Sequence, residues 1–271
     1  MRTTILYHHL TGSCRIEGAA LARVARARHV RVVAIDRPGF GGSSPHQDRT
    51  LADWPADALA VADELGIERF AVVGASGGAA HALTLAAAAS ARVSSVILAG
   101  PLPDKGHPAY GSQPWWLRAL LPITLSPVLW KTLMDRFMRD PQRFVDRRLF
   151  MREYDQQLVA DLYSDLYGKL LPEALKQGLD GLLQELRLLA QPWGIEWRAI
   201  RAPLHLYCGT SDMLVRFARG VAEREPQIHY AEFPGAQLAS LSPRYCDAIA
   251  AAAVHDGQVL RARVAARVAR R

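Results

Sequence analysis

Apolar runs of strand length alternate with amphipathic stretches over the first hundred residues. The amphipathic stretches carry their apolar residues at helical spacing. Strands are predicted at 4–9, 30–35, 70–74 and 93–99, and helices at 16–28, 50–65 and 77–90. Strands that alternate with helices form parallel sheets covered on both faces, so residues 1–100 are predicted to form a doubly wound α/β unit.

The alternation stops at residue 101 and resumes near residue 203. Residues 101–197 contain no convincing strand, but they hold several tryptophans, tyrosines and prolines among amphipathic stretches. Strands are then predicted at 203–208 and 228–233, and helices at 215–224 and 243–254. The pattern predicts one core, residues 1–100 and 198–271, with a helical cap inserted at 101–197. The aromatic residues predict an apolar pocket or, as the alternative, the cap's own core.

Composition places the chain among compact globular proteins. Of its 271 residues, 50% are hydrophobic and 22% charged, which suits one unit with a sizeable core. The net charge of +7 would suit nucleic acid or an anionic surface. However, many arginines fall on predicted helix faces and no nucleic-acid-binding signature is present, so we predict a small-molecule substrate and no nucleic acid partner.

Cysteine usage and hydropathy indicate whether the chain binds a metal and where in the cell it is expected. The three cysteines are scattered, without metal-ligand spacing or a disulfide framework, so no metal or cofactor is predicted. No apolar run reaches the roughly 18 residues of a membrane span, and the start of the chain has no cleavage-site pattern. A cytoplasmic protein that does not enter the membrane is therefore expected.

The clearest chemical motif follows the predicted strand at 70–74. Gly74, Ser76 and Gly78 form G-x-S-x-G between an apolar strand and a helix, which is the context that a nucleophile elbow requires. The small neighbours allow a sharp turn that exposes the serine, and the helix N-terminus directs free N–H groups, including that of Gly77, at the site. The alternative is a phosphate-binding glycine turn, but no P-loop lysine follows.

These residues resemble the α/β-hydrolase family over nearly the whole chain. Besides the elbow, the glycine-rich stretch 33–43 resembles the strand and turn that precede the elbow helix, and 192–212 resembles the stretch that leads to the catalytic acid. The resemblance implies an α/β-hydrolase fold with Ser76 as nucleophile. It also implies that Asp212, in the G-x-x-D turn at 209–212, is the acid. The alternatives are an Asx turn at Asp212 and Asp104 as the acid, although Asp104 more readily caps a loop.

The family's histidine is not in its usual turn. Aligned without gaps, the turn 233–240 has Gln237 and Leu238 in the places of the family's glycine and histidine. Leu238 cannot accept a proton, and a serine without a base is a poor nucleophile at neutral pH. Any hydrolysis therefore needs a substitute base.

The oxyanion turn, residues 8–13, also departs from the family's pattern. His8 matches the family's histidine, but His9 stands for a glycine and Thr11 for a proline. The resemblance implies that the Leu10 and Gly77 N–H groups hold the oxyanion. We expect His9 to be the substitute base, with His81 on the elbow helix as the second candidate. The alternative for each is a packed, hydrogen-bonded histidine.

The chain begins almost directly in its first parallel strand, whereas the family commonly has an antiparallel hairpin first. The strand at 30–35 is then an uncovered edge. A second copy could pair with it in a homodimer, loops could cover it, or the native chain could start upstream.

Three functions fit these residues. The first is an enzyme that acts on an apolar ester or carbonyl compound through Ser76. The second is a non-hydrolytic cyclase, lyase or isomerase of secondary metabolism, in which Ser76 and Asp212 bind and polarise the substrate. The third is a catalytically silent ligand-binding protein. Reaction of Ser76 with a fluorophosphonate separates the first from the others.

Overall fold

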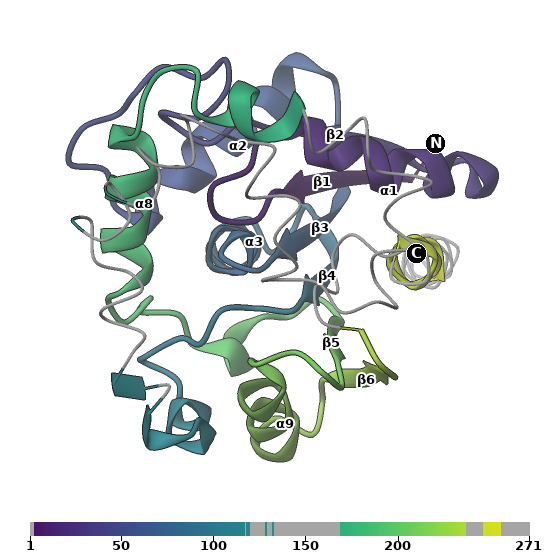
Figure 1. The fold of residues 1–271 in the computed structure, drawn as a ribbon. Coiled ribbons are helices and arrows are strands. Elements are labelled where there is room, and N and C mark those ends of the chain that lie inside the picture. The colour runs from purple at the N-terminus through teal and green to yellow at the C-terminus, as the bar shows by residue number, and fades with distance from the viewer. Residues whose placement is uncertain are drawn as a thin grey trace, which may run out of the picture.

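A single parallel sheet organises the computed structural model, which describes residues 3–116, 118, 119, 128, 132, 169–236 and 246–255 (Figure 1). Its strands are β1 (Thr4–His8), β2 (Arg31–Ala34), β3 (Phe70–Ala75), β4 (Val93–Ala99), β5 (Leu204–Gly209) and β6 (His229–Phe233). They are ordered β2-β1-β3-β4-β5-β6, and every neighbouring pair is parallel. The predicted doubly wound α/β sheet is confirmed.

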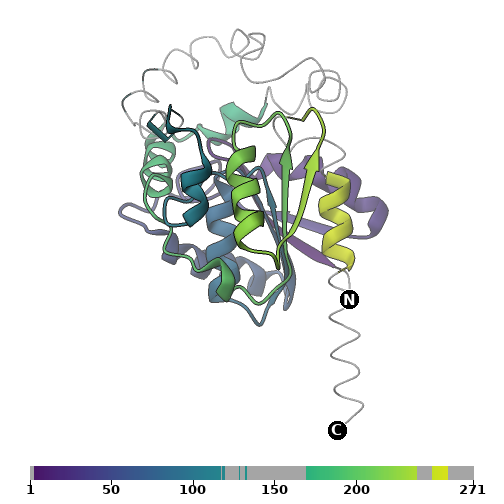
Figure 2. The same cartoon turned by 90° about the horizontal axis from the view of Figure 1, so that it is seen from below.

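Alternate residues of the strands enter two separate cores. Leu6, Val72 and Leu206 face a core shared with α2 (Trp54–Glu64), α3 (Gly78–Ala88) and α9 (Val215–Arg224). The residues beside them, such as Ile5 and Val73, face a second core shared with α1 (Gly18–Ala25) and the helical residues 246–255. Figures 1 and 2 show these two groups of helices on opposite faces of the sheet. Burial on both faces explains why β3 is apolar throughout and why the strands beside it are largely apolar.

One helix begins at the capping signal that the sequence predicts, and another is shorter than its predicted range. Thr50 and Asp53 form the predicted capping box: the Thr50 N–H and hydroxyl both donate to Asp53 Oδ2, at 2.7 and 2.9 Å. This box opens a 3₁₀ turn that leads into α2. The helix predicted over 16–28 is shorter than expected, because 3₁₀ turns at Arg15–Glu17 and Arg26–Arg28 flank α1.

The described residues between 101 and 197 contain helix and no strand, and a helical cap inserted at 101–197 stays a prediction. They include a 3₁₀ helix at Pro108–Ser112 and the helix α8 (Asp180–Leu189). α8 runs close to the turn that follows β2, since a Cβ added to Gly39 would lie 2.7 Å from Gly181 Cα. This packing brings α8 to the carboxyl-terminal edge of the sheet. Within the described residues, no helix is both long and apolar enough to cross a membrane.

β2 occupies the edge that the sequence predicts to be uncovered. In the described part of the chain β2 pairs with β1 alone, and its four residues range from half-buried to exposed. Pairing of this edge with a second copy of the chain remains a prediction.

Candidate active site

Ser76 lies at the turn between β3 and α3 in a strained backbone conformation. Its φ angle is +49°, in the left-handed region that residues with a side chain rarely adopt. The turn is fixed by three backbone bonds: Ser76 N–H donates to Ala99 O at 2.9 Å, and Ser76 O accepts from Ala79 N at 3.1 Å and from Leu102 N at 3.3 Å. The serine is partly exposed. Strain of this kind is retained where the surrounding structure enforces it, most often at functional sites.

Both glycines of the motif are required by close packing. A Cβ at Gly74 would lie 2.7 Å from Ala79 Cα, and a Cβ at Gly78 would lie 2.3 Å from His8 O. These are backbone contacts that no side-chain rotation can relieve. The motif at 74–78 is thus a strand-to-helix elbow, and the turn after β1 lies directly against it.

The two histidines that end β1 are buried and held by structural hydrogen bonds. His8 Nδ1 donates to Val73 O at 3.0 Å, and burial lowers the pKa of His8 to about 4. His9 Nδ1 donates to Leu10 O at 2.9 Å, which leaves Nε2 as an acceptor for the Arg37 N–H at 3.4 Å. Burial, followed by the charge of Arg37, lowers the pKa of His9 well below its usual value. For His9 to accept the Ser76 proton, Nε2 must leave the Arg37 amide.

His81 is enclosed in the same way. It is fully buried on α3, with Nδ1 3.4 Å from Gly77 O and Nε2 3.3 Å from Arg49 Nη1. Burial is the largest cause that lowers the pKa of His81. The ring of Trp54 lies edge-on between His8 and His81, with centroids 5.5 and 5.6 Å away. At neutral pH these histidines are therefore uncharged.

The Leu10 amide, expected to be an oxyanion donor, is directed at a carboxylate instead. Leu10 N–H donates to both oxygens of the Glu17 side chain, at 3.4 and 3.2 Å. Glu17 is fully buried and also accepts from the Tyr7 hydroxyl, and burial raises the pKa of Glu17. The Leu10 N–H can reach a substrate oxygen only if this contact breaks.

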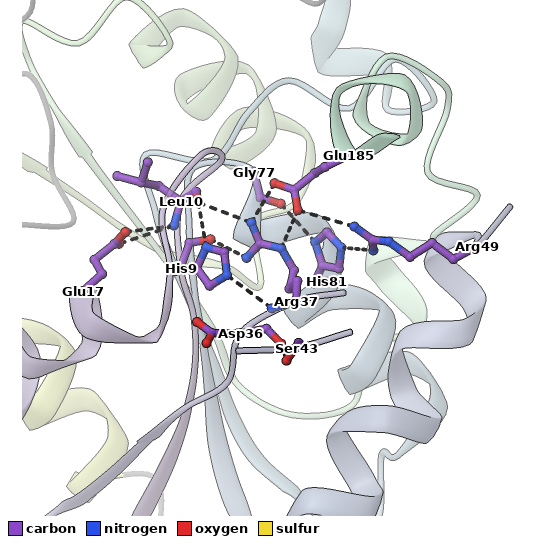
Figure 3. A network of polar contacts seen from close by, with 10 residues as sticks. All are labelled: His9, Leu10, Glu17, Asp36, Arg37, Ser43, Arg49, Gly77, His81 and Glu185. Atoms are coloured by element: carbon purple, nitrogen blue, oxygen red, sulfur yellow. Dashed lines mark hydrogen bonds and ion pairs between the residues drawn. The ribbon is translucent and has the colours of Figure 1, made fainter. Parts of the chain in front are cut away.

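A buried ion pair joins the turn after β2 to the helix α8. Arg37 Nε and Nη2 each donate to a Glu185 oxygen at 2.6 Å, and neither side chain is exposed. The same guanidinium donates to His9 O at 2.6 Å and to Leu10 O at 3.3 Å (Figure 3). Arg37 thus fixes the backbone of the oxyanion turn, and Glu185 fixes Arg37.

A second buried arginine makes this cluster positive. Arg49 is 4% exposed, and its Nη2 lies 3.7 Å from a Glu185 oxygen. Its Nε and Nη2 have no hydrogen-bond partner. Two guanidinium groups therefore share the one carboxylate of Glu185 beside the elbow, and Arg37 and Arg49 both contribute to lowering the pKa of His81.

The candidate acids follow the ends of β5 and β4. Asp212 is buried, and its Oδ1 accepts from Leu214 N at 2.8 Å, which is the geometry of an Asx turn. Asp104 accepts from Gly106 N at 2.8 Å and from Trp193 N at 3.1 Å, so it caps a loop as the sequence suggests. Leu238 lies outside the described residues.

We expect the buried neutral histidines to make stability fall as the pH drops from 7.5 to 5. His8 titrates near 6.5 when unfolded but near 4 when folded, so the unfolded chain binds more protons between these values. The stabilisation is complete above pH 6.5 and lost progressively toward pH 4, by about 3 kcal/mol for His8 alone. His9 and His81 act in the same direction, whereas Glu17, with its raised pKa, opposes them.

Urea unfolding measured at several pH values checks this expectation. In His8→Asn, the slope of unfolding free energy against pH between 5 and 6 should decrease by about 1 kcal/mol per pH unit. An unchanged slope in a folded variant would show that His8 does not titrate as its burial requires.

Sequence reasoning missed three of the residues that organise this site. Arg37, Glu17 and Glu185 all have weak signals in the sequence. Arg37 is a charged residue in a glycine-rich turn after a strand. Glu185 stands on the apolar stripe of α8, beside Leu182, Leu186 and Leu189, where a charge requires a buried partner.

Comparisons with known proteins agree with this architecture. A model of the alpha/beta hydrolase family matches residues 10–252. A search of curated proteins found no significant match.

Solved structures with a similar fold include three hydrolases. The first is an esterase from Rhodococcus sp. ECU1013, with a TM-score of 0.67, 18% identity, and coverage of 93% of this chain and 90% of that one. The second is the enol-lactonase from Burkholderia xenovorans LB400, with a TM-score of 0.65, 19% identity, and coverage of 95% of this chain and 92% of that one. The third is an epoxide hydrolase from Vigna radiata, with a TM-score of 0.64, 17% identity, and coverage of 96% of this chain and 92% of that one. At these identities the likeness concerns the fold. With a family model that spans most of its length and a strained serine at the elbow, this chain belongs to the alpha/beta hydrolase family.

Proposed function

We propose that this protein is an enzyme that hydrolyses a small apolar ester or lactone through Ser76. The observation that carries the proposal is the backbone of Ser76, held at φ +49° at the N-terminus of α3 and partly exposed. A chain without use for this serine could relax the strain by substituting glycine. Esterase and lactonase folds are also among the similar structures.

In the proposed reaction the Ser76 oxygen attacks the ester carbonyl and the Gly77 N–H stabilises the oxyanion that forms. The proton of Ser76 passes to a base, for which we propose His9. Its Nδ1–H is fixed on Leu10 O, and its Nε2 takes the proton after it leaves the Arg37 N–H. The same proton then goes to the leaving alcohol, and water hydrolyses the acyl-enzyme. Asp212, at the end of β5, is the proposed acid.

The apolar character of the substrate follows from the side chains around the elbow. A Cβ at Gly77 would lie 2.7 Å from Leu189 Cδ1 and 3.3 Å from Leu102 Cδ1. Apolar groups therefore approach the residue next to the nucleophile, and they would contact an acyl chain bound there.

Hydrolysis of p-nitrophenyl acetate, butyrate and octanoate tests the proposal. We expect turnover that Ser76→Ala abolishes and that His9→Asn reduces by about 10²-fold or more. His81→Asn is the matched control, because it removes a second buried histidine beside the same elbow. No turnover above that of Ser76→Ala with any of these esters, nor with a small lactone, would contradict the proposal.

A second function is favoured by one observation, the engagement of Leu10 N–H by Glu17. A site with one backbone donor occupied suits an enzyme that binds and polarises a carbonyl without forming an acyl-enzyme. In that case Ser76 donates a hydrogen bond and is never acylated.

A further inference from the structure

The hydroxyl of Thr11 is buried beside the elbow without a partner. Thr11 Oγ1 is inaccessible to solvent and has no hydrogen-bond partner in the structure. A buried hydroxyl of this kind costs about 1–3 kcal/mol, so its presence requires an explanation.

The position of this hydroxyl relative to Gly77 is fixed by a close contact. A Cβ built on Gly77 would lie only 2.0 Å from Thr11 Oγ1, closer than any other contact of that position. The oxygen therefore rests against Gly77 Cα, next to Ser76 along the chain. Gly77 has to be glycine for Thr11 to come so near.

The neighbouring backbone donor on the same turn is already in use. Leu10 N–H points to Glu17, and Arg37 fixes this arrangement by binding the carbonyl oxygens of His9 and Leu10 (Figure 3). The turn thus presents to the elbow an unpartnered side-chain hydroxyl from the residue that follows Leu10.

We propose that Thr11 Oγ1–H is the second oxyanion donor of this site, in place of the Leu10 amide. In this assignment substrate binding displaces the groups that cover the hydroxyl in the free protein. The hydroxyl then donates to the substrate's carbonyl oxygen as negative charge develops there, together with Gly77 N–H. No bond of Thr11 forms or breaks, and its proton stays on Oγ1. The assignment rests on the proposed function, because it requires a carbonyl attacked by Ser76.

The test compares the rate of Ser76 phosphonylation by a fluorophosphonate probe in wild type, Thr11→Val and Thr11→Ser. Phosphonylation places an oxygen in the oxyanion site without requiring turnover. Thr11→Val keeps the shape and removes the hydroxyl, so we expect a rate loss of about 10²-fold, while Thr11→Ser stays within a few-fold of wild type. Thr11→Val should also be at least as stable as wild type in urea, because it removes an unpartnered hydroxyl.

For any ester that is turned over, kcat should fall and KM should stay nearly constant in Thr11→Val. A folded Thr11→Val that reacts within threefold of wild type overturns the role of Thr11 and leaves the proposed function standing. A wild type that does not react at Ser76 overturns the proposed function, and the assignment of Thr11 with it.

Discussion

Ser76→Gly is expected to be inactive and yet more stable than Ser76→Ala. Both variants lose the hydroxyl of the proposed nucleophile, so turnover should fall by about 10³-fold or more. They differ in the backbone, because alanine keeps the strain of φ +49° and glycine does not. The glycine variant should therefore be more stable by about 1 kcal/mol in urea unfolding.

Glycine is usually less stabilising than alanine, so this order of stabilities is opposite to the usual one. A control position on α3, the helix that follows Ser76, checks it. Ala87 is exposed on α3, where Ala87→Gly should cost about 1 kcal/mol because glycine is a poor helix former. If Ser76→Gly is instead less stable than Ser76→Ala, the elbow stores no strain, and the argument that the chain retains it for function fails.

Breaking the Arg37–Glu185 pair should produce the largest loss of stability. Both side chains are fully buried. Glu185→Leu leaves the charges of Arg37 and Arg49 without their carboxylate, and Arg37→Met leaves Glu185 with only the more distant Arg49. Each single variant should lose about 3–5 kcal/mol, and the double variant should recover part of this loss, because only the charge of Arg49 then lacks its carboxylate. The measurement is urea unfolding of all four proteins as a double-mutant cycle.

The surface pair Arg219–Glu232 is the control. It has a similar two-bond geometry, at 2.7 and 2.8 Å, but the Arg219 side chain is 50% exposed. Arg219→Met should therefore cost about 1 kcal/mol or less. Equal costs at Arg37 and Arg219 would contradict the view that the buried pair locks α8 onto the oxyanion turn.

The fold follows from local patterns that the sequence displays directly. Apolar strand-length runs, the Thr50–Asp53 capping box and the G-x-S-x-G motif each depend on residues within a few positions of one another. Such signals predict the parallel sheet and the elbow at Ser76, because strand burial and turn geometry are set locally.

The arrangement of side chains and backbone donors at the site depends on contacts between residues far apart in the sequence, which no local pattern predicts. Arg37 meets Glu185 across 148 positions, and this pair determines where the backbone of residues 9 and 10 lies. The Leu10 amide was expected to face the elbow, but Glu17, seven residues later, accepts it. The sequence left open whether His9 is a substitute base or a packed histidine, and tertiary packing buries its ring against Phe40 and Arg37.

The most direct test of the central claim is the mass of the folded wild-type protein after reaction with a fluorophosphonate. If Ser76 is an activated nucleophile, the intact mass increases by one adduct, peptide mapping places the adduct on Ser76, and Ser76→Ala gains none. A wild type that is folded by circular dichroism and gains no adduct at Ser76 would contradict the claim and favour a site that polarises or binds its ligand without covalent chemistry.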